Sequence, residues 1–263
     1  MIIKKSGTCI YNTKALVTGA NRRYKKMQCK DNWLYKNCRG ENVKTLQKLI
    51  NATKLYTVAV DGWFYTQTET VLKKIQDLLW ITVDGIAGDQ TIGQLKIFPV
   101  GLQKIKNLIY DRQNNAYSCG DSALKMAASV YGLNLDENWL MQVAYTNSTN
   151  GTNISGLLNA INEVNKKYNT AFSPLNTGKM PLATLANYIK NGNPILARVE
   201  SFLRPGVGEH WVTIQGINLN NQTIGLADPS YSGNYRIITL SDFKKRIQFV
   251  INKGHDKPLI VLK

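Results

Sequence analysis

Histidine is nearly absent from this sequence: only His210 and His255 occur among its 263 residues. Any chemistry that needs an imidazole as acid, base or ligand must therefore use one of these two positions. If the chain is an enzyme that uses a histidine as its catalytic base, this scarcity leaves only two candidates.

Long apolar runs are also missing. No stretch approaches the roughly 20 apolar residues that a membrane-spanning helix needs. The opening segment, residues 1–8, lacks an apolar core of the length found in secretory signals. We therefore expect a protein with no membrane span that is made without an export signal.

Acidic residues are scarce as well, with 17 Asp and Glu against 33 Lys and Arg, so the formal net charge is +16. The excess is concentrated in residues 1–39, where ten basic residues face only Asp31. Such a basic arm suits nucleic acid, an anionic membrane surface or an anionic cell wall. A nucleic-acid partner would require a recognisable groove-reading or base-stacking module, of which Tyr24, Trp33 and Tyr35 are the only hint. We expect no nucleic-acid partner.

Three of the four cysteines, Cys9, Cys29 and Cys38, lie in the basic arm, and Cys119 stands apart. The first three allow a Cys29–Cys38 disulfide or part of a metal site. No histidine lies nearby to complete zinc coordination. Free thiols are therefore the default expectation for the arm.

The surroundings of Cys119 predict a helix that begins at this residue. Apolar and small residues recur after it at helical spacing, and Gly132 stands where a helix usually stops. The members of this stripe are Ala123, Leu124, Ala127, Ala128 and Tyr131. Free amide groups and the helix dipole favour a thiolate at a helix start, which is the form that acts as a nucleophile.

His210 begins an apolar run that reads as the first strand of a β-hairpin, with a turn near Asn220 and a second strand that reaches Asp228. A turn centred there places Asp228 opposite Val212. Asp228 then lies diagonal to His210 on the same face, because residues of equal parity share a face. A carboxylate at this point would orient the imidazole while its other nitrogen faces a thiol.

These residues match a known pattern: Gln113, then Cys119-Gly-x-x-x-Leu-x-Met, then Gly-x-His210-Trp-Val and Ala-Asp228-Pro. The pattern resembles the papain-like cysteine peptidases whose best-known members remove double-glycine leaders from bacteriocins, over roughly residues 110 to 263. The resemblance implies that Cys119 is the nucleophile and His210 the general base and acid. It also implies that Asp228 orients the histidine and that Gln113 donates to the oxyanion.

Each assignment has a simpler alternative. Cys119 could be an inert buried group, His210 a half-buried strand histidine and Asp228 an ordinary turn residue before proline. His255 lies among turn-forming residues and reads as a surface histidine. The family commonly has Asp before the nucleophile, whereas this chain has Ser118, with Asp121 two positions after Cys119; we expect this departure to affect the substrate rather than the chemistry.

The amino-terminal half carries a second signature, in which Val-Asp-Gly occurs at residues 60–62 and again at 83–85. It resembles the three-helix peptidoglycan-binding domain of wall hydrolases, although Tyr65 and Thr66 replace the usual Gly-Pro, which indicates an altered glycan groove. The Asp-Gly turns tolerate positive φ, and Thr68 and Thr91 then stand near helix starts as potential caps. The apolar stripes that would form its core are Val43, Leu46, Leu49, Val71, Leu72, Ile75, Leu78 and Leu79. The alternative is a helical packing domain without ligand.

The fold class expected from these parts is α+β: a small all-α wall-binding module followed by a papain-like cysteine peptidase domain. The boundaries are a basic arm at 1–39, the peptidoglycan-binding-like helices at 40–98 and the peptidase at 102–263, with a junction at 98–101 and a connecting helix over 102–110. Helices are expected from Cys119, Ile154 and Leu182. Strands are expected near Ile195, Trp211, Thr223, Arg236 and Ile260.

The two resemblances together imply a wall-lytic cysteine endopeptidase that cleaves peptide or isopeptide cross-links and needs no metal or organic cofactor. Residues 132–167 look like the cysteine peptidases of methanogenic archaea and their viruses, which implies pseudomurein as the wall polymer. The alternatives are a bacterial peptidoglycan peptidase or amidase, and a non-enzymatic wall-anchoring virion protein. We expect a monomer whose partner is the wall polymer, a virus-encoded lysin held in the host cytoplasm before lysis or carried on the virion.

Overall fold

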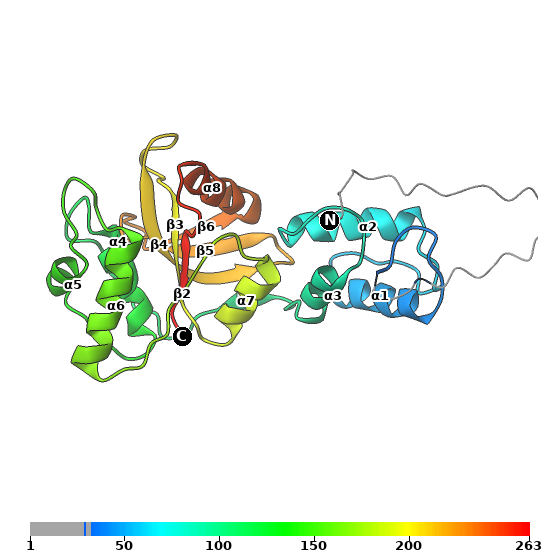
Figure 1. The fold of residues 1–263 in the computed structure, drawn as a ribbon, viewed down its shortest axis with the longest axis horizontal. Helices are drawn as coiled ribbons and strands as arrows, with labels where there is room; N and C mark the ends of the chain where they lie inside the picture. Colours follow the sequence, from blue (N-terminus) through cyan, green and yellow to red (C-terminus); the bar gives the residue numbers. More distant parts are fainter. Residues whose placement is uncertain (1–28, 30–32) are drawn as a thin grey trace, which may run out of the picture.

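The structure is a computed structural model that describes residue 29 and residues 33–263. Most of the basic arm expected at residues 1–39, Cys9 included, therefore lies outside the described residues. Two regions follow each other along the chain, a small helical region and then a region built on one β-sheet (Figure 1). The arrangement confirms the expected α+β class, with the helical module first.

The helical region contains three helices: α1 (Glu41–Ala52), α2 (Thr66–Leu78) and α3 (Asp89–Lys96). Each helix is amphipathic and turns its apolar stripe inward, as the sequence predicts. Most of the expected core residues are buried, and only Leu49 and Val71 remain partly exposed. Phe64, in the turn before α2, is wholly buried beside them.

The first Asp-Gly turn is held by a buried glutamine of α1. The side-chain amide of Gln47 donates to Asp61 Oδ1 at 2.8 Å, and Gln47 Oε1 accepts from the backbone N–H of Gly62 at 2.9 Å. Gly62 has φ of 77°, a conformation that a residue with a Cβ rarely adopts. One side chain therefore satisfies both the carboxylate and the backbone of the turn.

The second Asp-Gly turn repeats this construction with Gln76 of α2. Its amide donates to Asp84 Oδ1 at 2.8 Å, and its Oε1 accepts from the N–H of Gly85, also at 2.8 Å. Because the same three groups recur in the same roles, the two Val-Asp-Gly segments are a structural repeat as well as a sequence repeat.

The capping role expected for Thr68 and Thr91 is wrong. Helices α2 and α3 are preceded by Tyr65 and Gly88, which make no side-chain cap. Both threonines lie one turn further in, buried, where their hydroxyls meet the amide of the turn-holding glutamine. Each hydroxyl gives that buried amide one more acceptor, which lowers the cost of burying it.

Cys29 and Cys38 form a disulfide, so the default expectation of free thiols is wrong for this pair. Their Cα atoms lie 5.6 Å apart, within the range that a disulfide needs. A turn with Asn37 at φ of 76° brings the second cysteine, which is fully buried, toward the first. The bond also removes both sulfurs from any metal site.

The second region is built on an antiparallel sheet of order β2-β7-β3-β4-β5-β6, with β1 paired to β4. The strands are β1 (Leu102–Lys104), β2 (Leu175–Thr177), β3 (Ile195–Glu200), β4 (Glu209–Asn218), β5 (Thr223–Ala227), β6 (Tyr235–Thr239) and β7 (Leu259–Val261). The helices are α4 (Cys119–Ser129), α5 (Glu137–Val143), α6 (Ile154–Tyr168), α7 (Leu182–Lys190) and α8 (Leu240–Asn252). The expected helices begin at the predicted residues, and all five expected strands are present.

Helices cover both faces of the sheet (Figure 1). One core lies between the sheet and helices α4 to α6, and it includes the sheet residues Leu196, Trp211 and Ile260. The other lies under α7 and α8 and includes Val199 and Val212. The strands β3 and β4 are thus buried on both faces, which explains their nearly continuous apolar sequences.

The connecting helix expected over residues 102–110 is wrong, because this segment begins with strand β1. Leu102 pairs with Asn218 and Lys104 with Gly216, beyond the point where β3 ends its pairing with β4. Unpaired backbone groups at that edge need a partner, and β1 supplies it. The backbone approaches closely here: a Cβ at Gly216 would lie 2.9 Å from the carbonyl oxygen of Gln103.

The helical region docks against the sheet region around α7 through both apolar and polar contacts, and buried apolar residues of the two regions form one continuous cluster. The N–H of Leu182 donates to the carbonyl of Leu79 at 3.0 Å, and Gln94 of α3 donates to Thr184 Oγ1 at 2.8 Å. Figure 1 shows α3 and α7 side by side. Within the described residues, no helix has both the length and the apolar character required to span a bilayer.

Candidate active site

Cys119 is the first residue of α4, as its sequence context predicts, and its thiol is half-buried. Gly120 follows because there is no room for a side chain: a Cβ at this position would lie 2.6 Å from Cβ of Thr152. The N-terminal turn of α4 is thereby pressed against residue 152. The thiol stands at the end of the helix where the backbone dipole favours negative charge.

His210 lies near the start of β4 and is 7% exposed. Its Nε2 is 2.7 Å from Oδ1 of the fully buried Asp228. The same carboxylate accepts from the backbone N–H and hydroxyl of Ser230, at 2.9 and 2.8 Å, and from Arg236 Nε at 2.5 Å. Asp228 is thus held in one orientation by three partners, and the histidine leaves its Nδ1 free for the thiol.

The contact between His210 and Asp228 depends on a β-bulge. Near the turn, Asn218 of β4 pairs with Thr223 of β5. This pairing centres the hairpin half a residue later than the sequence predicts. If the same register continued along both strands, Asp228 would lie opposite Thr213. The register shifts between Ile214 and Gly216, and Thr213 then pairs with Ala227. The extra residue in β4 therefore returns Asp228 to the same face of the sheet as His210.

The electrostatics favour a thiolate beside a charged imidazole. Burial raises the pKa of Cys119, but its hydrogen bond to His210, the histidine's charge and the N–H of Trp211 outweigh burial and bring the pKa below its ordinary value. Burial lowers the pKa of His210, but Asp228 and Cys119 together raise it to about 9. The carboxyl of Asp228 keeps a pKa well below its usual range despite burial, because His210, Arg236 and Ser230 stabilise its charge.

These shifts predict a bell-shaped dependence of kcat/KM on pH. The active thiolate forms as pH rises through the lowered pKa of Cys119, and the proton needed on His210 is lost as pH rises through about 9. Activity should therefore rise on the acid side and decline near pH 9. Steady-state rates from pH 4 to 10 measure both limbs, and Asp228→Asn should move the alkaline limb to lower pH. An alkaline limb unchanged in that variant would contradict the coupling.

Gln113 lies beside the segment that carries Asp228, because its backbone N–H donates to the carbonyl of Pro229 at 3.1 Å. Its side-chain amide donates to the carbonyl of Asn115 at 2.6 Å, while its Oε1 is buried without a hydrogen-bond partner. The structure therefore brings Cys119, His210 and Asp228 together and places Gln113 on the loop before α4. Its oxyanion role stays a prediction.

Asp121 is a site residue to which sequence reasoning assigned no structural role. Its carboxylate is fully buried and accepts from Thr152 at 2.8 Å and from Thr146 at 3.1 Å. Burial raises its pKa to about 6. The carbonyl of Thr152 in turn accepts from the indole of Trp211 at 2.9 Å. Asp121 thus ties α4 to the loop that closes one side of the cleft, and its position two residues after Cys119 was the only sequence signal.

A cleft of about 380 Å³ opens beside Cys119 and His210. It is lined by residues 116–117 and the loop 148–152, and by Arg198 of β3, Arg204 and Val207 of the loop that follows, and the start of β4. The reacting thiol is therefore open to a polypeptide-like substrate.

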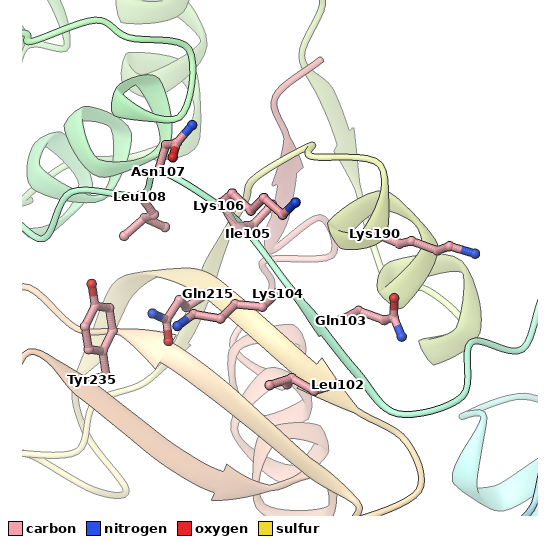
Figure 2. Close-up of a pocket in the computed structure, with 10 residues that line it drawn as sticks. All are labelled: Leu102, Gln103, Lys104, Ile105, Lys106, Asn107, Leu108, Lys190, Gln215 and Tyr235. Atoms are coloured by element: carbon pink, nitrogen blue, oxygen red, sulfur yellow. The ribbon is translucent and has the colours of Figure 1, made fainter.

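A larger cavity, of about 730 Å³, lies at the other end of β4 and holds no cysteine, histidine or carboxylate (Figure 2). Lys104, Lys106 and Lys190 line it, and Figure 2 shows that their ammonium groups do not converge on one point. This cavity therefore lacks the thiol, imidazole and carboxylate that lie together at Cys119.

His255 is separate from the cleft. Its side chain is 37% exposed, and its Nε2 lies 3.5 Å from Oε2 of Glu209. The sequence predicts a surface histidine, and the side chain is indeed partly exposed, although it also contacts this acidic neighbour. His210 is the histidine that the structure places beside the thiol.

Comparisons with known proteins identify two regions of the chain. Residues 105–253 match the model of the Peptidase C39 like family, and residues 39–95 match that of a putative peptidoglycan binding domain. No curated protein sequence matches the chain.

Several solved peptidase structures resemble part of the chain at low identity. The peptidase domain of Streptococcus ComA, a bifunctional ABC transporter, is 20% identical with a TM-score of 0.44, covering 59% of this chain and 97% of its own. A putative C39-like peptidase from Bacillus anthracis is 15% identical with a TM-score of 0.47, covering 62% and 97%. A double-glycine motif protease from an AMS/PCAT transporter is 15% identical with a TM-score of 0.40, covering 62% and 94%. Because the first family model spans more than half of the sequence, this protein belongs to the Peptidase C39 like family, and it is a cysteine peptidase that carries a peptidoglycan-binding domain.

Proposed function

We propose that the protein hydrolyses peptide or isopeptide cross-links of a cell-wall polymer, with Cys119, His210 and Asp228 as its catalytic triad. The observation that carries the proposal is the 2.7 Å contact between His210 and the buried carboxylate of Asp228, which three partners hold in one orientation. This pair lies next to the Cys119 thiol at the start of α4. The peptidoglycan-binding domain in the same chain supports a wall polymer as the target.

The chemistry follows from this arrangement. The Cys119 thiolate attacks the carbonyl carbon of the scissile amide. The oxyanion that forms receives hydrogen bonds from the backbone N–H of Cys119 and from the side-chain amide of Gln113. That amide has a second proton besides the one it donates to the carbonyl of Asn115. His210 transfers its Nδ1 proton to the leaving nitrogen as the C–N bond breaks. A water molecule, deprotonated by His210, then attacks the thioester, which releases the acid and restores the thiol.

The remaining assignments extend this proposal. Residues 40–98 retain the wall polymer, residues 102–263 cleave it, and the basic arm 1–39 adds attraction to an anionic wall. The peptidase would act as a lysin that reaches the wall from the host cytoplasm or on a virion. Pseudomurein is the first candidate polymer, on the resemblance of residues 132–167 to archaeal and viral peptidases. Bacterial peptidoglycan is the second, and the peptidoglycan-binding domain favours it.

Side-by-side digestion of purified pseudomurein and bacterial peptidoglycan tests the proposal, with mass spectrometry of the released peptides and labelling of the new amines. We expect peptide-bond cleavage in one polymer, and the mass of the labelled fragment tells an α-amine from a side-chain amine. Cys119→Ser is the matched control, which should sediment with the same wall without cleaving it. Wall binding by the intact protein with no cleavage of either polymer would replace the peptidase proposal with an anchoring role.

A further inference from the structure

The charged groups in the cleft are not balanced. Two of them, Arg198 of β3 and Glu209 of β4, form a salt bridge of 2.6 Å in which both side chains are only 15% exposed. Glu209 is also the neighbour of His255. Glu209 is the one carboxylate among the residues that line the cleft, and it is already paired with Arg198. Arg198 therefore has its partner within the protein.

Arg204 has no such partner. It lies on the loop 201–208 between β3 and β4, its side chain is exposed, and it forms no salt bridge with any carboxylate in the described part of the chain. It lines the same cleft as Cys119 and His210. A guanidinium that faces a substrate cleft without a counter-charge is available to a ligand.

The loop holds Arg204 in place. Its carbonyl accepts from the N–H of Gly208 at 2.8 Å, and its N–H donates to Ser201 Oγ at 3.3 Å. The side chain lies directly over Gly208: a Cβ there would be 3.0 Å from Cβ of Arg204 and 3.2 Å from its Nε. The side chain of Arg204 is therefore packed against the residue that immediately precedes β4, two positions before His210.

We propose that Arg204 forms a carboxylate-binding subsite, so that the preferred substrate carries a free carboxylate close to the scissile bond. The inference rests on the proposed function and narrows its substrate class. A guanidinium binds a carboxylate through two parallel hydrogen bonds and stays charged at any pH in use. An amide made through a glutamate side chain leaves that residue's α-carboxylate free, so isopeptide cross-links of this kind have the required group.

A pair of alkylating reagents tests the subsite without any wall substrate. Iodoacetate and iodoacetamide both let the Cys119 thiolate displace iodide from a methylene carbon, with formation of an S–C bond, and they differ only in carboxylate against carboxamide. The ratio of the Cys119 alkylation rate with iodoacetate to that with iodoacetamide should fall about threefold or more in Arg204→Gln. In Arg204→Lys this ratio should stay close to that of the unaltered protein, because the positive charge is kept. The reaction is followed on the tryptic peptide 113–125, which contains Cys119 and excludes Cys9.

Lys106→Gln is the matched control, because it also removes one positive charge but lies in the separate cavity (Figure 2). Its rate ratio should equal that of the unaltered protein, and added salt should lower the ratio only where Arg204 is present. A ratio unchanged in Arg204→Gln, or lowered equally in Lys106→Gln, would overturn the subsite. An iodoacetamide rate close to that of the unaltered protein shows that Arg204→Gln retains its fold.

Cleavage of matched peptides then extends the test to catalysis. Wall fragments with the free carboxylate and with the corresponding carboxamide should differ in kcat/KM by about tenfold, and Arg204→Gln should remove the difference while retaining cleavage of the amide form. Equal loss on both fragments would overturn the specificity role. Failure to cleave either fragment would instead contradict the proposed function, and the alkylation ratio would still decide the subsite.

Discussion

Cys119→Ala should lose essentially all hydrolysis of the wall polymer, with kcat lowered on the order of 10⁴-fold or more, because Cys119 is the one thiol among the residues that line the cleft. The fold should persist, since the substitution removes a single half-buried sulfur atom from the start of α4. Release of labelled amines measures the activity, and circular dichroism with thermal melting measures the fold. Wild-type turnover by a clean preparation of this variant would remove Cys119 from the mechanism.

Cys119→Ser gives the companion result. A serine hydroxyl in the same place is far less acidic than a thiol, so His210 cannot hold it as an anion and activity should again be lost. Wall binding should be retained in both variants, because residues 39–95, which match the binding domain, are untouched. Loss of binding together with activity would mean that the substitution had disturbed the protein beyond the site.

The two histidines should respond in opposite ways. His210→Ala should lower kcat on the order of 10⁴-fold, because it removes both the stabilising partner of the thiolate and the proton donor for the leaving amine. His255→Ala should stay within a few-fold of the unaltered protein, since its one acidic contact, with Glu209, is also served by Arg198. The same steady-state assay compares them.

Alkylation separates a chemical from a structural loss in these variants. Without His210 the pKa of Cys119 should rise, so iodoacetamide should react more slowly near pH 7 and regain its rate at higher pH. In His255→Ala the alkylation profile should be unchanged. An inactive His255→Ala beside an active His210→Ala would show that the hairpin places the wrong histidine at the site.

Several parts of this site could be predicted locally. The spacing of small and apolar residues after Cys119 requires a helix that starts there, because only a helical period brings them to one buried face. The apolar runs around Asn220 likewise require a hairpin, and the two-histidine composition leaves few choices for the base. These features depend on residues close together in the chain, where patterning and turn chemistry decide the outcome.

The His210–Asp228 contact was predicted from a turn centred near Asn220, and the register that follows from it is observed beside the site but not beside the turn. The turn is centred later than expected, and the bulge between Ile214 and Gly216 compensates for the difference. A bulge leaves almost no mark on an apolar strand sequence, because both faces of β4 are buried and show no alternation that could reveal the extra residue.

The sequence by itself determined the α+β class, the order of the two regions, the helix start at Cys119 and the identity of the scarce histidine beside it. Tertiary structure alone decided that residues 102–104 form a strand rather than a helix, because the open edge of β4 offers backbone partners that periodicity does not record. It also decided the Cys29–Cys38 disulfide, the burial of Asp121 against the loop 148–152 and the unbalanced charge of Arg204. Each of these depends on groups far apart in the chain, whose meeting is set by packing rather than by local pattern.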